Sequence, residues 1–179
     1  MHRIVPAITS LHQHLDSLVR EPAVYRPAAC PHCGLGRLWG HGCYGRKADR
    51  RPGASVSLNP IPIPRFFCQG CRQTCSRLPE CIAPRRWYDW ALQQVVLLLL
   101  LGGGSLHQCS VLSGLDRRTI RRWWTWLCGR TDAFGMFLRA RFPELGRAVD
   151  LRGFWQGCLK AMPLSQAMAW LDRDGVAVP

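Results

Sequence analysis

Two Cys-x-x-Cys pairs constrain the fold of this chain more than any other feature of its sequence. Cys30 and Cys33 form the first pair, and Cys68 and Cys71 form the second. This spacing allows a tight backbone turn to bring two thiolates to one tetrahedral Zn²⁺. Four thiolates complete the coordination sphere and leave no position for a substrate, so we predict a structural zinc site.

A pair of redox dithiols is the alternative reading of the same cysteines. A thioredoxin-like dithiol is expected beside a βαβ pattern, which this sequence lacks. In a small module, zinc contributes folding free energy on the order of 10 kcal/mol. We expect His32 to face solvent or phosphate. A second metal site is possible in the remaining group, but we favour spare thiols in the core; the group is His41, Cys43, Cys75 and Cys81.

The charge of the chain favours a polyanionic partner. The net charge is +13, and all but two of the 24 basic residues are Arg. Arginine has a planar fork that pairs with phosphates and with guanine edges. A protein that binds a membrane surface would have a similar charge, so the charge alone does not decide the partner.

The sequence predicts a cytoplasmic, nucleoid-associated protein without a membrane anchor. The first twenty residues lack a signal-peptide pattern, so the ten cysteines are expected in a reducing compartment. The apolar run Val95–Leu101 is much shorter than the roughly 20 residues that span a bilayer. We expect this run to be a buried helix segment.

The composition predicts an α+β fold, in which a small zinc ribbon is followed by a mostly helical helix-turn-helix domain. The predicted segments are an N-terminal helix at 1–23, a zinc-ribbon module at 24–83, a helix-turn-helix domain at 84–130 and a C-terminal helical extension at 131–179. Helical periodicity and strand patterns predict helices at 7–20, 87–101, 105–113, 116–128, 134–142, 154–161 and 164–172, and strands at 37–39 and 65–67.

The segment 105–124 has the pattern of a helix-turn-helix. Gly114 suits a turn with positive φ, Asp116 suits an N-cap, and Ser110 is the small residue expected where the two helices touch. Ile120, either Trp123 or Trp124, and Leu127 recur at helical spacing and would face the core.

The opposite face of the second helix would then be basic. A solvated basic helix is the alternative, but the register of the turn favours DNA reading in the major groove. Other basic clusters in loops are further candidates for phosphate contacts. The predicted DNA-binding residues are Arg117, Arg118, Thr119, Arg121 and Arg122 on the helix, and Arg46, Lys47, Arg50, Arg51, Arg85 and Arg86 in the loops.

Four motifs in this order resemble the N-terminal DNA-binding region of bacterial insertion-sequence transposases, over residues 24–130. The motifs are Cys30-Pro-His-Cys-Gly, Ile61-Pro-Ile-Pro-Arg-Phe-Phe-Cys-Gln-Gly-Cys-Arg-Gln-Thr, Leu78-Pro-Glu-Cys-Ile-Ala-Pro and Arg118-Thr-Ile-Arg-Arg-Trp-Trp. The resemblance implies sequence-specific binding of double-stranded DNA. Such transposases cut DNA with three carboxylates on an RNase H-like domain, and the residues after Cys128 are too few to build one. We therefore expect a non-catalytic accessory protein that serves a separate transposase or recombinase subunit, with a homo-oligomer as a further option.

Three other functions remain open from the sequence. The first alternative is a transcriptional regulator that uses the same DNA-binding helix. An RNA-binding zinc ribbon would stack bases on Trp39, Phe66 and Phe67. A protein-interaction scaffold would bind its partner through apolar residues of the C-terminal extension. Alternatively, these residues would be buried in a core against the helix-turn-helix. They are Phe134, Phe137, Phe142, Phe154, Trp155, Met162, Met168 and Trp170.

Overall fold

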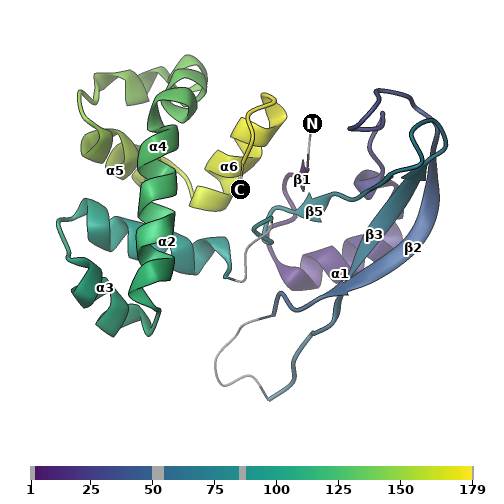
Figure 1. Ribbon diagram of the computed structural model, residues 1–179, viewed down its shortest axis with the longest axis horizontal. Helices are drawn as coiled ribbons and strands as arrows, with labels where there is room; N and C mark the ends of the chain where they lie inside the picture. The colour runs from purple at the N-terminus through teal and green to yellow at the C-terminus, as the bar shows by residue number, and fades with distance from the viewer. Residues whose placement is uncertain (1–2, 50–54, 85–87, 179) are drawn as a thin grey trace. The chain divides into compact units, whose positions relative to one another are not determined.

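The computed structural model describes residues 3–49, 55–84 and 88–178, and the chain forms two compact units (Figure 1). Met1–Asp89 and Ala177–Pro179 belong to the first unit, and Trp90–Val176 form the second. The strands lie in the first unit and the second unit is helical, which is the predicted α+β class. The predicted segments 1–23 and 24–83 fold together within the first unit.

The first unit combines a three-stranded sheet, a two-stranded sheet and one α-helix. The antiparallel sheet has the order β2-β3-β4, and β1 pairs in parallel with β5. The elements are β1 (Ile4–Val5), α1 (Leu11–Arg20), the 3₁₀ helix η1 (Pro22–Tyr25), β2 (Leu38–Arg46), β3 (Ile61–Cys68), β4 (Thr74–Cys75) and β5 (Leu78–Pro79).

Strands β2 and β3 are much longer than the predicted strands at 37–39 and 65–67. β3 includes Pro62 and Pro64, although a proline lacks the N–H that a strand residue donates. Within the described residues β4 pairs only with Phe66 and Phe67, so β2 is the one strand that pairs with β3 where the prolines lie. A proline on an open strand edge removes no ladder hydrogen bond, and the strand extends through both.

Helix α1 is fixed to the sheet by a buried histidine. Its N-cap is Ser10, whose side chain accepts a hydrogen bond from the N–H of Gln13. His14 Nε2 donates to the carbonyl of Pro62 at 2.9 Å, which leaves Nδ1 to accept from the Tyr25 hydroxyl at 2.6 Å. Burial lowers the pKa of His14 and raises the pKa of Tyr25 to about 12, so both groups are neutral at pH 7.

The second unit consists of helices packed around one long helix. Its elements are α2 (Trp90–Leu101), α3 (Leu106–Ser113), α4 (Arg117–Arg141), the 3₁₀ helix η2 (Pro143–Arg147), α5 (Leu151–Ala161) and α6 (Leu164–Arg173). Figure 1 shows α4 crossing α2. The prediction of two helices at 116–128 and 134–142 is wrong, because α4 is continuous, and the predicted boundary at 130/131 falls inside it.

The apolar C-terminal residues form the core of the second unit rather than a free surface. Phe134, Phe154 and Trp155 are fully buried, and Trp155 Nε1 donates to the Thr131 hydroxyl at 3.0 Å. Met168 is also fully buried, and the half-buried rings of Phe142 and Trp170 pack edge to face, with their centroids 6.1 Å apart. Of the two places that the sequence left open for these residues, the structure supports the core. No helix in the described part of the chain is both long enough and apolar enough to span a membrane.

Candidate metal centre and nucleic-acid interface

The four predicted cysteine ligands lie together at one end of the β2–β3 hairpin. The Sγ atoms of Cys30, Cys33, Cys68 and Cys71 are all within 4.8 Å of one another. The closest pairs, Cys30 with Cys71 and Cys33 with Cys68, are each 3.6 Å apart, which is too far for a disulfide. A tetrahedral site with metal–sulfur bonds of about 2.3 Å separates its sulfurs by about 3.8 Å. The cluster therefore has the dimensions of one closed four-thiolate metal site.

The two cysteine turns are built in the same way. Gly34 N–H donates to the carbonyl of Cys30 at 2.8 Å, and Arg72 N–H donates to the carbonyl of Cys68 at 2.9 Å. In both turns the N–H of the first cysteine donates to the carbonyl five residues later, at 2.8 and 2.9 Å. The residue after the second cysteine is left-handed in both, with φ of +75° at Gly34 and +58° at Arg72. The second turn thus places a side chain where the first has glycine.

This difference predicts opposite effects of substitution in the two turns. Arg72→Gly is expected to stabilise the first unit by about 1 kcal/mol, because glycine adopts positive φ without strain. Gly34→Ala is expected to destabilise it by about 1 kcal/mol, because alanine is strained at positive φ. A Cβ at Gly34 meets no neighbouring atom, so this backbone strain is the only cost expected. The measurement is the free energy of unfolding in denaturant at fixed free metal. Arg72→Ala is the control, because it removes the charge but keeps the Cβ. An equal gain in this variant would contradict the conformational explanation.

The four sulfurs differ in how readily they become thiolates. The amide of Cys71 lowers the pKa of the Cys68 thiol to about 7, so this sulfur is readily a thiolate. The amide of Gln73 also favours a thiolate at Cys71, but burial and the neighbouring sulfurs raise the pKa of Cys71 to about 12. Sulfurs this close cannot all be anionic unless a metal ion compensates their charge.

The described cysteines and histidines outside the four-cysteine group do not form a second cluster of this kind. Within the described residues the four-cysteine group is the single cluster with three or more potential ligands. Cys75 is buried in the core of the ribbon, where burial raises its pKa, and burial also raises the pKa of Cys81 to about 12. Cys43 is exposed, and His32 is exposed as predicted, with its N–H donating to Cys30 Sγ at 3.4 Å.

The turn between α3 and α4 has the predicted local structure. Gly114 ends α3 with φ of +69°, and Asp116 Oδ1 caps α4 by accepting from the N–H of Arg118 at 2.7 Å. Ser110, the small residue predicted at the contact between the two helices, is half-buried, and its neighbour Cys109 is fully buried. The hydroxyl of Ser110 donates across the turn to the carbonyl of Leu115 at 2.6 Å.

The first turns of α4 separate an apolar face from a basic one. Ile120, Trp123 and Leu127 are buried at no more than 1% exposure, and Trp124 is only half-buried. All four arginines of the predicted DNA-reading face are exposed, whereas Thr119 is half-buried; the arginines are Arg117, Arg118, Arg121 and Arg122. The helix therefore presents a row of guanidinium groups to solvent at its N-terminal end.

The loop arginines divide between described and undescribed positions. The predicted contacts Arg50, Arg51, Arg85 and Arg86 lie outside the described residues. Lys47 is exposed, but Arg46 is half-buried and its Nη2 donates to the carbonyl of Ala83 at 2.5 Å. Arg46 also lines a polar pocket together with Arg3 and Arg65, two residues that sequence reasoning did not single out.

Residues 30–123 match the model of a protein family described as Domain of unknown function (DUF6431). The chain belongs to this family. The DUF6431 match begins at Cys30 and ends at Trp123, so it includes the four-cysteine cluster, α3, the turn that follows it and the first turns of α4. No curated protein and no solved structure matches the chain.

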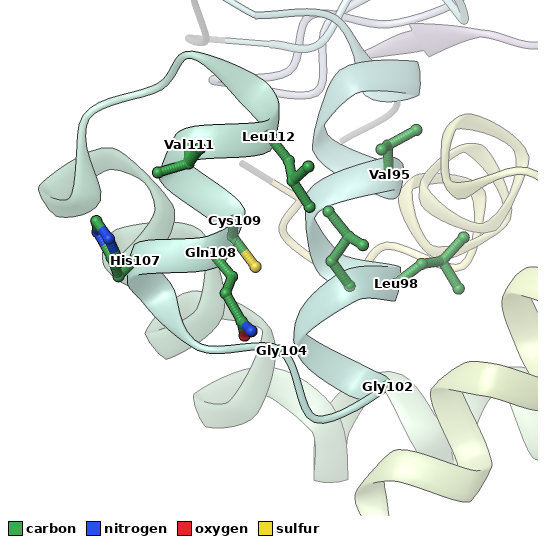
Figure 2. A pocket seen from close by; sticks show the side chains of 10 residues that line it. Val95, Leu98, Gly102, Gly104, His107, Gln108, Cys109, Val111 and Leu112 are labelled. Carbon is green, nitrogen blue, oxygen red and sulfur yellow. The ribbon is translucent and has the colours of Figure 1, made fainter.

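The DUF6431 domain also carries an exposed apolar groove of about 890 Å³ between α2 and α3 (Figure 2). Val95 and Leu98 line it from α2, and Val111 and Leu112 line it from α3. The prediction that Val95–Leu101 is a buried segment therefore holds for only one face of α2. Val96 and Leu97 are fully buried, whereas Val95 is 54% exposed.

The aromatic residues proposed to stack on RNA do not form one exposed platform. Trp39 is 59% exposed, but Phe66 is 7% exposed and belongs to the core of the ribbon. Phe67 is half-buried, and its ring lies 5.8 Å from that of His41. A stacking surface needs rings that are open on one face, so Phe66 cannot contribute to one.

Proposed function

We propose that this protein binds double-stranded DNA in a sequence-specific manner through the first turns of α4. The observation that carries the proposal is the exposed row of arginines on a capped helix that follows a left-handed glycine turn. The major groove is wide enough to admit an α-helix, and arginine forks recognise both guanine edges and phosphates. The burial of Ile120 and Trp123 orients this row toward solvent.

We further propose that the four-cysteine centre holds a structural Zn²⁺. The donor set supports zinc because thiolates favour this borderline-soft ion, whereas Mg²⁺ and Ca²⁺ take oxygen ligands. Cys30, Cys33, Cys68 and Cys71 would hold it with no open position, so the ion would supply folding free energy rather than chemistry.

The third part of the proposal is an accessory, non-catalytic role, in transposition or at another mobile element. Support comes from the resemblance to transposase DNA-binding regions. It also comes from acidic side chains that have structural roles as helix caps or in an ion pair. Asp116 and Asp150 cap helices, and Asp174 pairs with Arg141 at 3.0 Å. Strand transfer needs two or three carboxylates that converge on metal ions. On this proposal a separate transposase or recombinase subunit supplies the chemistry, and the protein acts at DNA in the cytoplasm.

Fluorescence anisotropy with a labelled DNA duplex tests the proposal. With about six phosphate contacts, the logarithm of the binding constant is expected to fall against the logarithm of salt concentration with a slope near −5. Single-stranded RNA of the same length should bind more weakly. The same preparation is expected to leave supercoiled plasmid intact in Mg²⁺. Tighter binding of RNA would favour the RNA-binding alternative, and nicking abolished by one acidic substitution would contradict the non-catalytic role.

A further inference from the structure

A second basic site lies in the first unit and uses no residue of α4. It is a pocket of about 360 Å³ on the ribbon, formed by the sheet, the N-terminal segment and the first cysteine turn. No carboxylate lines the pocket among the residues that the structure describes. The lining residues are Arg3, His32, Tyr44, Arg46, Arg65, Thr74, Cys75, Ser76, Leu78 and Pro84.

The three arginines come from three separate segments, and their contacts involve the backbone of Arg3 and the side chains of Arg46 and Arg65. The carbonyl of Arg3 accepts from the N–H of Leu78 at 2.7 Å, where β1 and β5 meet. Arg46, at the end of β2, is held by its bond to a backbone carbonyl. The guanidinium of Arg65, on β3, lies 5.5 Å from the centre of the Tyr44 ring. Their convergence is therefore part of the fold.

Hydroxyl groups complete the polar lining of the pocket. The Tyr44 hydroxyl and Ser76 Oγ lie 3.4 Å apart, and Thr74 lies next to them on β4. Hydroxyls donate to anionic oxygens, and arginine forks bind such oxygens in a bidentate manner. Burial lowers the pKa of Arg46 while Tyr44 raises it. The partial loss of water around this guanidinium strengthens its interaction with an anion.

We propose that this pocket is a binding site for a phosphate group. Three arginines, two or three hydroxyls and a wall without carboxylates match the charge and the acceptor geometry of a phosphate. The ligand is either a phosphate of a nucleic-acid backbone or a free phosphate. The site goes beyond the proposed function of α4 and does not depend on it.

Isothermal titration calorimetry of the zinc-loaded full chain with inorganic phosphate, at ionic strength held constant with chloride, tests the site. Arg65→Gln is expected to weaken phosphate binding about tenfold, because it removes a charged hydrogen-bond donor. Tyr44→Phe should weaken it also, while it keeps the ring beside Arg65. The matched control is Arg26→Gln, since Arg26 is exposed, lies 5.8 Å from the Phe66 ring and is outside the pocket.

Loss of phosphate binding in the two pocket variants, with wild-type affinity in Arg26→Gln, supports the proposal. A labelled duplex then identifies the source: Arg65→Gln reduces the salt slope by about one if the ligand is a backbone phosphate, and leaves it unchanged if the ligand is free phosphate. Arg121→Ala should retain phosphate binding, because the pocket contains no residue of α4. The phosphate titration therefore tests the pocket alone, and duplex binding by Arg121→Ala tests the α4 proposal. No phosphate binding beyond that of chloride, or equal loss in Arg26→Gln, overturns the proposal.

Discussion

Cys68→Ser is expected to release the metal ion and to unfold the first unit while the helices of the second unit remain folded. Cys68 is fully buried and belongs to the same core cluster as Cys30, so its loss removes a ligand and disturbs the core together. Structural zinc contributes on the order of 10 kcal/mol. This value equals the whole stability of a typical domain, which is about 5–15 kcal/mol.

Two measurements on the purified chain check this result. Elemental analysis should find about one zinc per wild-type chain and none in Cys68→Ser. Amide exchange should become fast at Ile61 and Ile63 but stay slow at Leu127. Cys43→Ser is the matched control, because Cys43 is an exposed cysteine of the same unit outside the cluster. Full protection of the first unit in a strong chelator, with no metal detected, would contradict the account.

Arg118→Ala and Arg121→Ala are each expected to weaken duplex binding by about 1–3 kcal/mol. Both side chains are exposed on α4, and alanine is the best helix former, so the helix itself should remain intact. A lost base contact costs this much because it leaves a guanine edge or a phosphate without its partner. The dissociation constant from fluorescence anisotropy at fixed salt measures the loss.

Arg130→Ala is the control for this prediction. Arg130 is an exposed arginine of the same helix beyond Leu127, so its replacement removes the same charge far from the N-terminal turns. This variant is expected to lose only a small, sequence-independent part of the affinity. Wild-type affinity in both Arg118→Ala and Arg121→Ala would place the DNA site elsewhere on the protein.

The features that sequence reasoning located correctly depend on residue types at short, fixed spacing. Each Cys-x-x-Cys pair specifies its own turn, and Gly114 and Asp116 specify the end of one helix and the start of the next. These local signals were enough to position the metal cluster and the turn before α4. They hold because the backbone geometry of a turn or cap is set within about five residues.

The length of α4 depended on packing that local signals do not reveal. The predicted helix ended at Cys128, and the next residue is Gly129, a residue type that costs about 1 kcal/mol in a helix interior. The structure continues the helix because Phe134 and Leu138 are buried in the same core as Leu127. Burial of each large side chain contributes about 1.5–3 kcal/mol, which exceeds the cost of the glycine.

The phosphate pocket is invisible in the sequence for a different reason. Arg3, Arg46 and Arg65 are far apart along the chain, and strand pairing brings them together. Without the register of β2 on β3, no spacing rule relates these three residues. The anchoring of α1 by His14 was missed in the same way, because its partners Tyr25 and Pro62 lie in other elements.

Selection from a library of randomised DNA duplexes tests the central claim most directly, because it measures sequence preference rather than charge attraction. The account predicts that the wild-type chain enriches one motif. It also predicts that Arg121→Ala loses preference at a single position of that motif, whereas Arg130→Ala selects the same motif as wild type. Enrichment of no motif by the folded, zinc-loaded chain, or an unchanged motif in both Arg118→Ala and Arg121→Ala, would contradict sequence-specific reading by α4.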